Sequence, residues 1–310
     1  MRLSQMAKSN VRADMPWLLI DGGYLAYRAL WSLRGDPVSQ QRELIAFGMM
    51  DDLRCICCDS RCQSNRVAVF FDSADRVRRE LFPKYKMNRK PKTFEEQEQK
   101  DFLHDSIHFA IKETFPVIGV PVYQKVGYEA DDLIASACSG CGQAIVITAD
   151  NDLYQLISDS VHWYNPHRRI YHTKSSFVDE KGISPSDWVK VKAIAGCSGD
   201  GIPGVGGVGE KTAIQYLLKT CSISLRRTNA IECPKGRAII ERNLKLVQLP
   251  YIGTGDINLS EPDWDARLFS MACNRYGLET FMEGERLACW KKIISGHFSV
   301  EGLQLKRKRK

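Results

Sequence analysis

Three short apolar segments, each ending in aspartate, constrain the fold of this 310-residue chain more than any other feature. They are "WLLID" (17–21), "RVAVFFD" (66–72) and "QAIVITAD" (143–150). Segments with a helical pattern lie between or beside them, at 40–58, 95–114 and 129–138. Short strands that alternate with helices predict a parallel α/β sheet. Ligands of such sheets bind at the carboxyl ends of the strands, where we expect Asp21, Asp72 and Asp150 to lie.

More acidic residues are expected at the same edge. The stretch "GYEADDLIAS" (127–136) holds Glu129, Asp131 and Asp132, and "TADND" adds Asp152. Carboxylates this close would raise one another's pKa unless a cation lay among them. An oxygen-only ligand set favours Mg²⁺ or Mn²⁺ over zinc. Acids also occur in first helical turns and at strand ends for purely structural reasons, so the metal prediction depends on all the positions together.

Composition limits the class of protein. The chain is 44% hydrophobic and 26% charged, as in soluble globular proteins. It has neither an apolar run long enough to span a membrane nor a secretory leader, so we expect no membrane partner and a cytoplasmic location. The net charge of +7, together with the basic end "LKRKRK", favours a polyanionic partner.

Eleven cysteines are a high number for such a chain. Cys55, Cys58 and Cys62 recur on one face of a predicted helix, and Cys138 and Cys141 form a CxxC pair. A zinc site would need a second pair of ligands at suitable spacing, and the sequence offers no obvious one. We therefore predict reduced, mostly buried thiols and keep zinc as the alternative.

The stretch "GDGIPGVGGVGEKTA" is rich in glycine. It does not follow a predicted strand, so its formal GxGxxG does not indicate a dinucleotide site, and Glu210 interrupts the P-loop pattern. A glycine turn that opens a helix offers backbone N–H groups to a DNA phosphate. A simple turn between two helices is the alternative.

Four regions are predicted along the chain. Residues 1–15 are predicted to form a flexible extension, and residues 16–180 a sheet domain with a basic, partly helical insertion after its second strand. From 181 to 290 the chain is predicted to be helical, and 291–310 form a basic tail.

Five segments in register resemble the 5′-nuclease (flap endonuclease) family. They are "LLIDGGYLAYR", "FFDS…YKMNR", "GYEADDL", "TADNDLYQL" and "GVGGVGEKTA", and the resemblance covers roughly residues 16–285. That family includes stand-alone phage 5′-3′ exonucleases and the amino-terminal nuclease domain of bacterial DNA polymerase I. The resemblance implies a Rossmann-like sheet with a helical arch around 76–110, then a helix-hairpin-helix domain. No polymerase segment follows, so we expect the stand-alone form, in a bacterial or phage-infected cell.

The resemblance also implies roles for individual residues. It implies two divalent ions, Mg²⁺ or Mn²⁺, held at a first site by Asp21, Asp72, Glu129, Asp131 and Asp132 and at a second by Asp150, Asp152 and Asp200. It places catalytic roles on Lys86, Arg89, Tyr85 and Arg28. It places DNA contacts, with a potassium ion at the hairpin, on Lys84, Lys192, Gly204, Gly206, Gly207, Gly209, Lys211 and Thr212.

One departure from the family pattern concerns the second site. Cys197 stands where the family has an aspartate, and a soft thiol is a poor ligand for Mg²⁺. We therefore expect a weaker second site, or one that fills only with substrate. The implied activity is hydrolysis of DNA at 5′ ends and flap junctions by a monomer, leaving 5′-phosphates, in replication or primer removal; RNA–DNA hybrids are further expected substrates. The alternatives are a branched-DNA-binding protein without turnover and a metal-dependent RNase.

Overall fold

The computed structural model describes residues 13–32, 42–74, 76–220 and 223–298. Most of the predicted N-terminal extension and of the basic tail therefore lies outside the described residues. A six-stranded sheet has the order β3-β2-β1-β4-β5-β6, in which β1 to β5 are parallel and β6 is antiparallel to β5. The strand bounds are β1 (Trp17–Asp21), β2 (Val67–Phe71), β3 (Val122–Gln124), β4 (Ala144–Ile147), β5 (Val161–Asn165) and β6 (Ile170–His172). The predicted parallel α/β sheet is confirmed.

Strand β1 is central, pairing with β2 and with β4. Its side chains alternate between two cores. Leu18 and Ile20 pack into one core, and Trp17 and Leu19 into the other. All four are buried, so β1 runs through the interior and brings Asp21 to the sheet edge.

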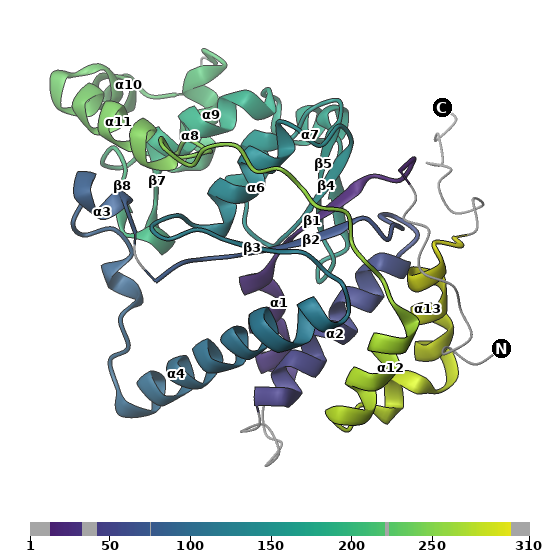
Figure 1. The fold of residues 1–310 in the computed structure, drawn as a ribbon. Helices are drawn as coiled ribbons and strands as arrows, with labels where there is room; N and C mark the ends of the chain where they lie inside the picture. The colour runs from purple at the N-terminus through teal and green to yellow at the C-terminus, as the bar shows by residue number, and fades with distance from the viewer. Residues whose placement is uncertain (1–12, 33–41, 75, 221–222, 299–310) are drawn as a thin grey trace.

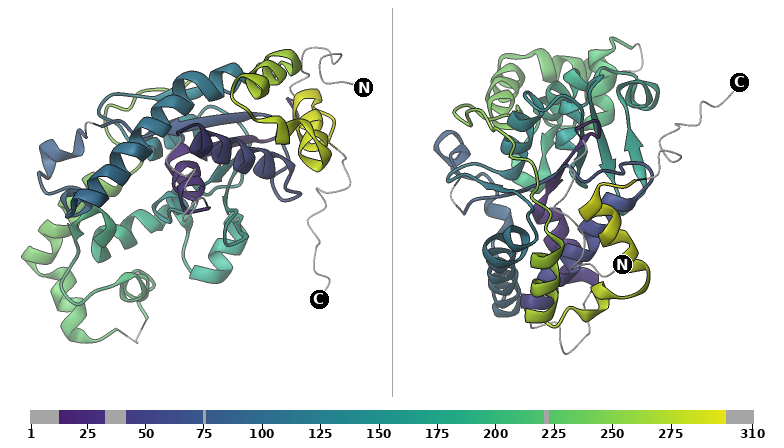
Figure 2. Two further views of the ribbon diagram at one scale, coloured as in Figure 1. Left: turned by 90° about the horizontal axis from the view of Figure 1, so that it is seen from below. Right: turned by 45° about the vertical axis from the view of Figure 1, so that its right-hand side comes forward.

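The first face of the sheet is covered by helices from both ends of the chain (Figures 1 and 2). They are α1 (Gly22–Ser32), α2 (Arg42–Cys58), α4 (Phe94–Phe109), α5 (Phe115–Val117), α12 (Ala266–Arg275) and α13 (Gly284–Ser295). A π-helical turn, Ala110–Thr114, joins α4 to α5. Helix α13 packs on α2, and Trp264, Phe269 and Trp290 share a core with Leu18. The sequence analysis placed these residues with the helical region after 181; the domain boundaries themselves stay a prediction.

The remaining long helices lie on the second side of the sheet (Figure 1). They are α6 (Ala130–Cys138), α7 (Lys174–Lys181), α8 (Trp188–Ala195), α9 (Glu210–Leu217), α10 (Leu225–Glu232) and α11 (Pro234–Val247). Helix α6 packs on β1, β2 and β3, whereas α9 and α11 pack on α8, and α10 packs on α11. Between α8 and α9 the chain forms a small antiparallel pair, β7 (Gly196–Cys197) and β8 (Ile202–Pro203), followed by the glycine turn. The glycine-rich stretch therefore joins two helices that pack on each other.

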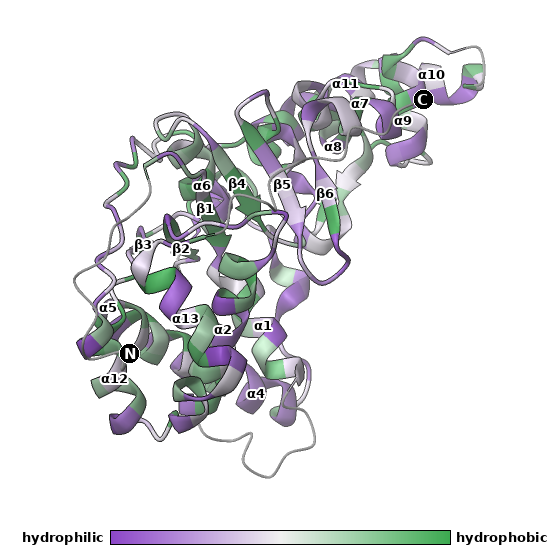
Figure 3. Cartoon of the chain, turned by 90° about the vertical axis from the view of Figure 1, so that its right-hand side faces the viewer, coloured by the Kyte–Doolittle hydropathy of each residue, from purple (hydrophilic) through white to green (hydrophobic). Residues whose placement is uncertain are grey.

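Strands β3, β5 and β6 were not expected from the sequence. Strand β3 is only three residues long. Strands β5 and β6 carry hydrophilic residues such as His162, Asn165 and His172, whereas the expected strand β4 is hydrophobic along its length (Figure 3). The basic insertion forms a short helix α3 (Arg78–Leu81) and a 3₁₀ turn (Met87–Arg89) ahead of α4. No helix in the described part of the chain is both long and apolar enough to cross a membrane.

Candidate active site

Acidic side chains from six segments of the chain meet at the carboxyl edge of the central strands. Asp21 ends β1, Asp72 directly follows β2, and Asp150 lies beyond β4. Because β1, β2 and β4 are adjacent and parallel, these three positions share one edge. The remaining acids come from the start of α6, a 3₁₀ turn and the loop after β7, namely Glu129, Asp131, Asp132, Asp152 and Asp200.

Three of these carboxyls act on one another through their charges. Burial, followed by the charge of Asp72, raises the pKa of Asp21 to about 6. Burial, followed by the charge of Asp152, raises the pKa of Asp150 to about 6. Burial together with the charges of Asp150 and Asp21 raises the pKa of Asp131 well above its usual value. Within the described residues, none of these three forms an ion pair with lysine or arginine, so no basic side chain binds directly to the centre of the cluster.

Basic side chains of the insertion neutralise the rim of the cluster. Arg76 bonds to both Asp72 and Glu129. Lys86 Nζ lies 2.7 Å from Glu129 Oε1, and Arg89 Nη2 lies 2.5 Å from Asp200 Oδ1. Partial burial raises the pKa of Asp72, but Lys86 and Arg76 outweigh it and the net pKa is lowered. The insertion thus closes onto the acids rather than projecting freely from them.

Tyr85 and Lys86 are buried within this contact. The Tyr85 hydroxyl donates to Glu129 Oε2 at 2.6 Å and contacts Asp200 Oδ2 at 3.2 Å. Burial, with the charge of Asp200, raises the Tyr85 pKa. Lys86 has a left-handed backbone (φ 53°), and its N–H donates to the Asp200 carbonyl at 2.8 Å. This uncommon conformation in a non-glycine residue turns the lysine toward Glu129.

Asp132 has different partners from its neighbour Asp131. Its two oxygens receive both ends of the Arg78 guanidinium, at 2.6 and 2.7 Å. The backbone N–H groups of Glu129 and Tyr251 donate to the same carboxylate. Both oxygens of Asp132 are therefore engaged by the protein.

Asp152 is held by a lysine and a thiol. Lys192 Nζ lies 2.8 Å from Asp152 Oδ1, and Cys197 Sγ donates to Asp152 Oδ2 at 3.5 Å. The Asp152 N–H donates to Asp150 Oδ1 at 2.8 Å, which joins this corner to the central acids. Lys192, predicted to contact DNA, is buried here; Lys84 and Lys211 are exposed.

The other predicted positions lie further from the acids. Arg28 forms a forked pair with Asp52 on α2 and contacts the Tyr24 hydroxyl, and no contact with the acidic cluster is found for it within the described residues. The predicted DNA-binding residues of the glycine turn, Gly204, Gly206, Gly207, Gly209, Lys211 and Thr212, lie together ahead of and within the first turn of α9. Arg76, Arg78 and Thr148, whose hydroxyl donates to Asp21 at 3.0 Å, were not assigned to the site from the sequence. For Arg76, its spacing of four residues from Asp72 was a signal in the sequence that the two side chains could pair.

The donor chemistry of the central acids fits a hard divalent cation. Asp21, Asp131 and Asp150 offer oxygens only, and the neighbouring carboxylates that help to raise their pKa values would favour a bound cation. Among the described residues, however, no group of three or more His, Cys, Asp or Glu side chains is arranged closely enough to surround an ion. The acids converge without forming a complete coordination shell, and basic side chains occupy several of their oxygens.

We expect the free energy of unfolding of the metal-free protein to fall as pH rises from about 4 to 6. The pKa of Asp21 is raised in the folded state, from 3.8 to about 6, so in this window the folded chain binds more protons than the unfolded chain. At 1.36 kcal/mol per pH unit, the loss at Asp21 is at most about 3 kcal/mol. Thermal melts in EDTA at pH 4.5 and 7 would measure it. Asp21→Asn should flatten the dependence; an equal slope in the variant would contradict the assignment.

Comparison with known proteins agrees with this architecture. Residues 16–184 match the family model described as 5′-3′ exonuclease, N-terminal resolvase-like domain. The chain belongs to the 5′-3′ exonuclease family. Within it, the chain is 33% identical over 206 residues to a thermostable DNA polymerase I from Thermus aquaticus, covering 64% of this chain and 23% of the polymerase. It is 29% identical over 283 residues to DNA polymerase I of Mycobacterium tuberculosis, covering 84% of this chain and 30% of that polymerase. The chain thus spans about a quarter of the length of these curated relatives.

Solved structures share the exonuclease fold at lower identity. The D15 protein of bacteriophage T5, co-crystallised with metal ions, aligns with a TM-score of 0.62 and 19% identity, over 88% of this chain and 99% of that one. Human GEN1 in complex with Holliday junction DNA aligns with a TM-score of 0.59 and 13% identity, over 92% of this chain and 75% of GEN1. These likenesses confirm the fold class.

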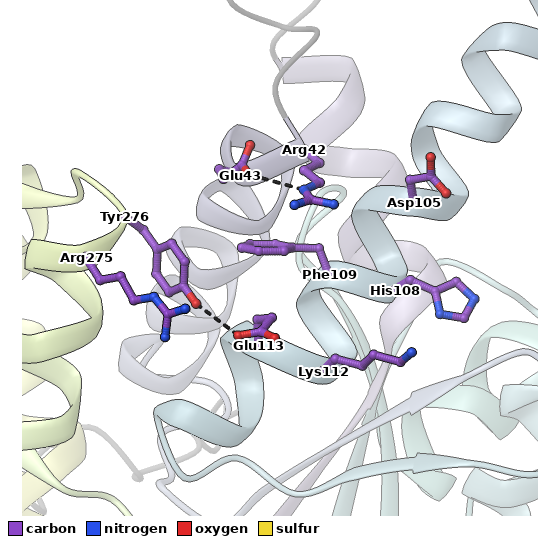
Figure 4. A pocket seen from close by; sticks show the side chains of 9 residues that line it. All are labelled: Arg42, Glu43, Asp105, His108, Phe109, Lys112, Glu113, Arg275 and Tyr276. Atoms are coloured by element: carbon purple, nitrogen blue, oxygen red, sulfur yellow. Dashed lines mark hydrogen bonds and ion pairs between the residues drawn. The ribbon is translucent and has the colours of Figure 1, made fainter.

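Two other features lie outside the acidic cluster. A hollow of about 550 Å³ opens between α2, α4 and α12, lined by Arg42, Glu43, Asp105, His108, Phe109, Lys112, Glu113, Arg275 and Tyr276 (Figure 4). Three of its lining side chains are Lys or Arg and three are Asp or Glu, so their formal charges cancel. The Tyr276 hydroxyl donates to Glu113 Oε2 at 3.2 Å. The described cysteines are free thiols, of which Cys55 and Cys233 are exposed.

Proposed function

We propose that this chain is a structure-specific 5′ nuclease that hydrolyses DNA phosphodiesters at 5′ ends and flap junctions, in replication or primer removal. The observation that carries the proposal is the acidic cluster at the carboxyl ends of β1, β2 and β4, bordered by Lys86 and Arg89. Acids alone would repel a DNA phosphate. With divalent cations among them and basic side chains beside them, the same edge attracts it.

Asp21, Asp72, Asp131 and Asp150 are the proposed holders of divalent metal, with Glu129, Asp152 and Asp200 at the rim. When bound there, Mg²⁺ or Mn²⁺ supplies the Lewis acidity that activates water and stabilises the leaving 3′ oxygen, a task for which two ions suit one phosphate. The acids of the chain would determine which phosphate water attacks. Cleavage of the bond between that phosphorus and the 3′ oxygen leaves a 5′-phosphate and a 3′-hydroxyl.

Lys86 and Arg89 are proposed to exchange their acidic partners for the substrate phosphate. Both now bind carboxylates, so their ammonium and guanidinium groups are already directed at the site. There they would offset the negative charge that gathers on the phosphate in the transition state. Tyr85 would hold Glu129 in place during this exchange, because its hydroxyl bonds that carboxylate. Arg28 is proposed to contact the substrate from α1.

The glycine turn is proposed to grip the duplex. A Cβ at Gly206 or Gly209 would meet nothing of this chain within 4 Å, so the protein's own packing does not require glycine there. Bare backbone at these positions lets a DNA phosphate approach the N–H groups ahead of α9, with Lys211 and Thr212 beside it and a potassium ion as a further proposed ligand. Residues 181–250 hold eleven Lys and Arg against five Asp and Glu. Contacts of this kind read the DNA backbone and imply little sequence preference.

The experiment that tests the proposal is cleavage of an end-labelled 5′-flap duplex by the purified chain with Mg²⁺, with Mn²⁺ and with EDTA. We expect cutting near the junction that requires metal and falls at least about a hundredfold in Asp72→Asn. A matched RNA–DNA hybrid measures action on primers. Tight flap binding without cutting in either metal would instead favour a branched-DNA-binding protein, for which Lys192 and Cys197 at Asp152 are the supporting contacts. Preference for single-stranded RNA would favour an RNase.

A further inference from the structure

Lys192 on α8 is a buried basic side chain beside the acidic cluster, with three polar partners. Only 6% of the residue is exposed. Its ammonium group contacts Asp152 Oδ1 at 2.8 Å, Glu210 Oε1 at 2.9 Å and Asn151 Oδ1 at 3.0 Å. An ammonium group has three N–H donors, so these three acceptors use all of them.

The three partners belong to different parts of the fold. Asn151 and Asp152 lie just beyond β4, where Asp152 also donates its N–H to Asp150. Glu210 is the first residue of α9 and directly follows Gly209 of the glycine turn. One buried ammonium group therefore links the proposed duplex grip to the proposed catalytic edge.

A DNA contact does not account for this geometry. To reach a phosphate, Lys192 would have to leave three partners and expose Asp152 and Glu210 as unpaired acids. Lys211, the second residue of α9, is exposed and can therefore reach the backbone of bound DNA.

We propose that Lys192 is a positioning residue, which holds the glycine turn at a set distance from the acidic cluster. This inference rests on the proposed nuclease function. A duplex gripped at the turn then presents one particular phosphate to Asp150 and Asp152. Without the link, the duplex is still gripped, but the cleaved phosphate is less well defined and less well aligned.

The test compares Lys192→Met, which keeps the length of the side chain and removes its charge, with Lys211→Met as the matched control. Flap affinity is measured in EDTA by fluorescence anisotropy, and cleavage is measured in single turnovers at saturating DNA, with product lengths resolved to one nucleotide. We expect Lys192→Met to lower the rate 10- to 100-fold, as loss of a residue that orients a catalytic ligand does, to broaden the product lengths, and to change Kd less than threefold. Lys192→Arg should recover part of the rate. Lys211→Met should change Kd more than the rate.

Other results would overturn the inference. If Lys192→Met raises Kd tenfold or more while its single-turnover rate and product lengths match the wild type, Lys192 contacts DNA instead. Circular dichroism and thermal melts establish that the variant folds. If it does not, Glu210→Gln breaks the link from the exposed side: a severalfold lower rate with broadened products supports the inference, and a wild-type rate and product pattern overturns it. A wild-type chain that cuts no flap overturns the proposed function itself, and this inference with it.

Discussion

Asp131→Asn is expected to lower the flap-cleavage rate by roughly a hundred- to a thousandfold, the range found when one preorganised transition-state contact is removed. Asp131 is surrounded by Asp21, Asp72 and Asp150, whose charges act on it together. Asparagine has the same size but removes one anionic oxygen donor from the centre of the cluster. Because the substitution also relieves repulsion among neighbouring acids, the metal-free variant should unfold at the same temperature as the wild type or higher. Single-turnover cleavage and thermal melts in EDTA measure both effects.

Asp132→Asn is the matched control on the adjacent residue. It removes the charge that Arg78 pairs with, so its main effect should be on stability. Asp131→Asn would then lower the cleavage rate, whereas Asp132→Asn would mainly lower the stability of the fold. An Asp131→Asn enzyme that cuts within threefold of the wild-type rate would show that the cluster is not the site of chemistry.

Arg78→Met is expected to lower the free energy of unfolding by about 3–5 kcal/mol, the usual effect of leaving one partner of a buried ion pair alone. Arg78 is 3% exposed and Asp132 is fully buried. Arg78 also donates to the Leu246 carbonyl at 2.8 Å and lies over the Tyr251 ring at 4.6 Å. It therefore joins α3, α6 and the segment after α11, and its loss leaves Asp132 charged in a dry interior. Urea unfolding followed by circular dichroism would measure the change.

The double variant Arg78→Met/Asp132→Asn provides the control. With the buried charge also removed, the double variant should lose less stability than the two single changes added together, because the residues share one interaction. Additive losses, or a loss below about 1 kcal/mol for Arg78→Met alone, would contradict the role given to this pair.

Glu129 connects the basic insertion to the acidic cluster. It receives Arg76, Lys86 and Tyr85, all from the insertion, and it begins α6, which carries Asp131. In this structure the insertion and the cluster neutralise each other's charge. On the proposed function, substrate phosphate and divalent metal together would supply the same two charges, so the insertion would exchange one set of partners for the other without a large change in net charge.

The central sheet was predictable because its strands are fully buried. Segments 17–21, 66–72 and 143–150 each contain an apolar run bounded by polar residues, so they indicate strands without further context. Strand β5 is mostly buried but contains His162 and Asn165, and β6 is a three-residue strand at the sheet edge, so the local sequence there carries a weaker signal. Helix α12 and most of α13 lie within the region predicted to be helical, but no local pattern states which core a helix will join.

The acidic residues of the site were likewise predictable, because strand-end positions and the short "EADD" motif place them at one edge whatever the rest of the chain does. Their individual partners were not. Asp131 and Asp132 are adjacent in sequence, yet helical geometry turns one toward the cluster and the other toward Arg78. Lys192 and Lys211 are both basic residues of one hairpin, yet one is buried against Asp152 and one is exposed. Strand, helix and sheet edge follow from short-range periodicity, which the order of residues carries directly. Which charge meets which depends on contacts between segments far apart in the chain, and those are formed only when the layers pack.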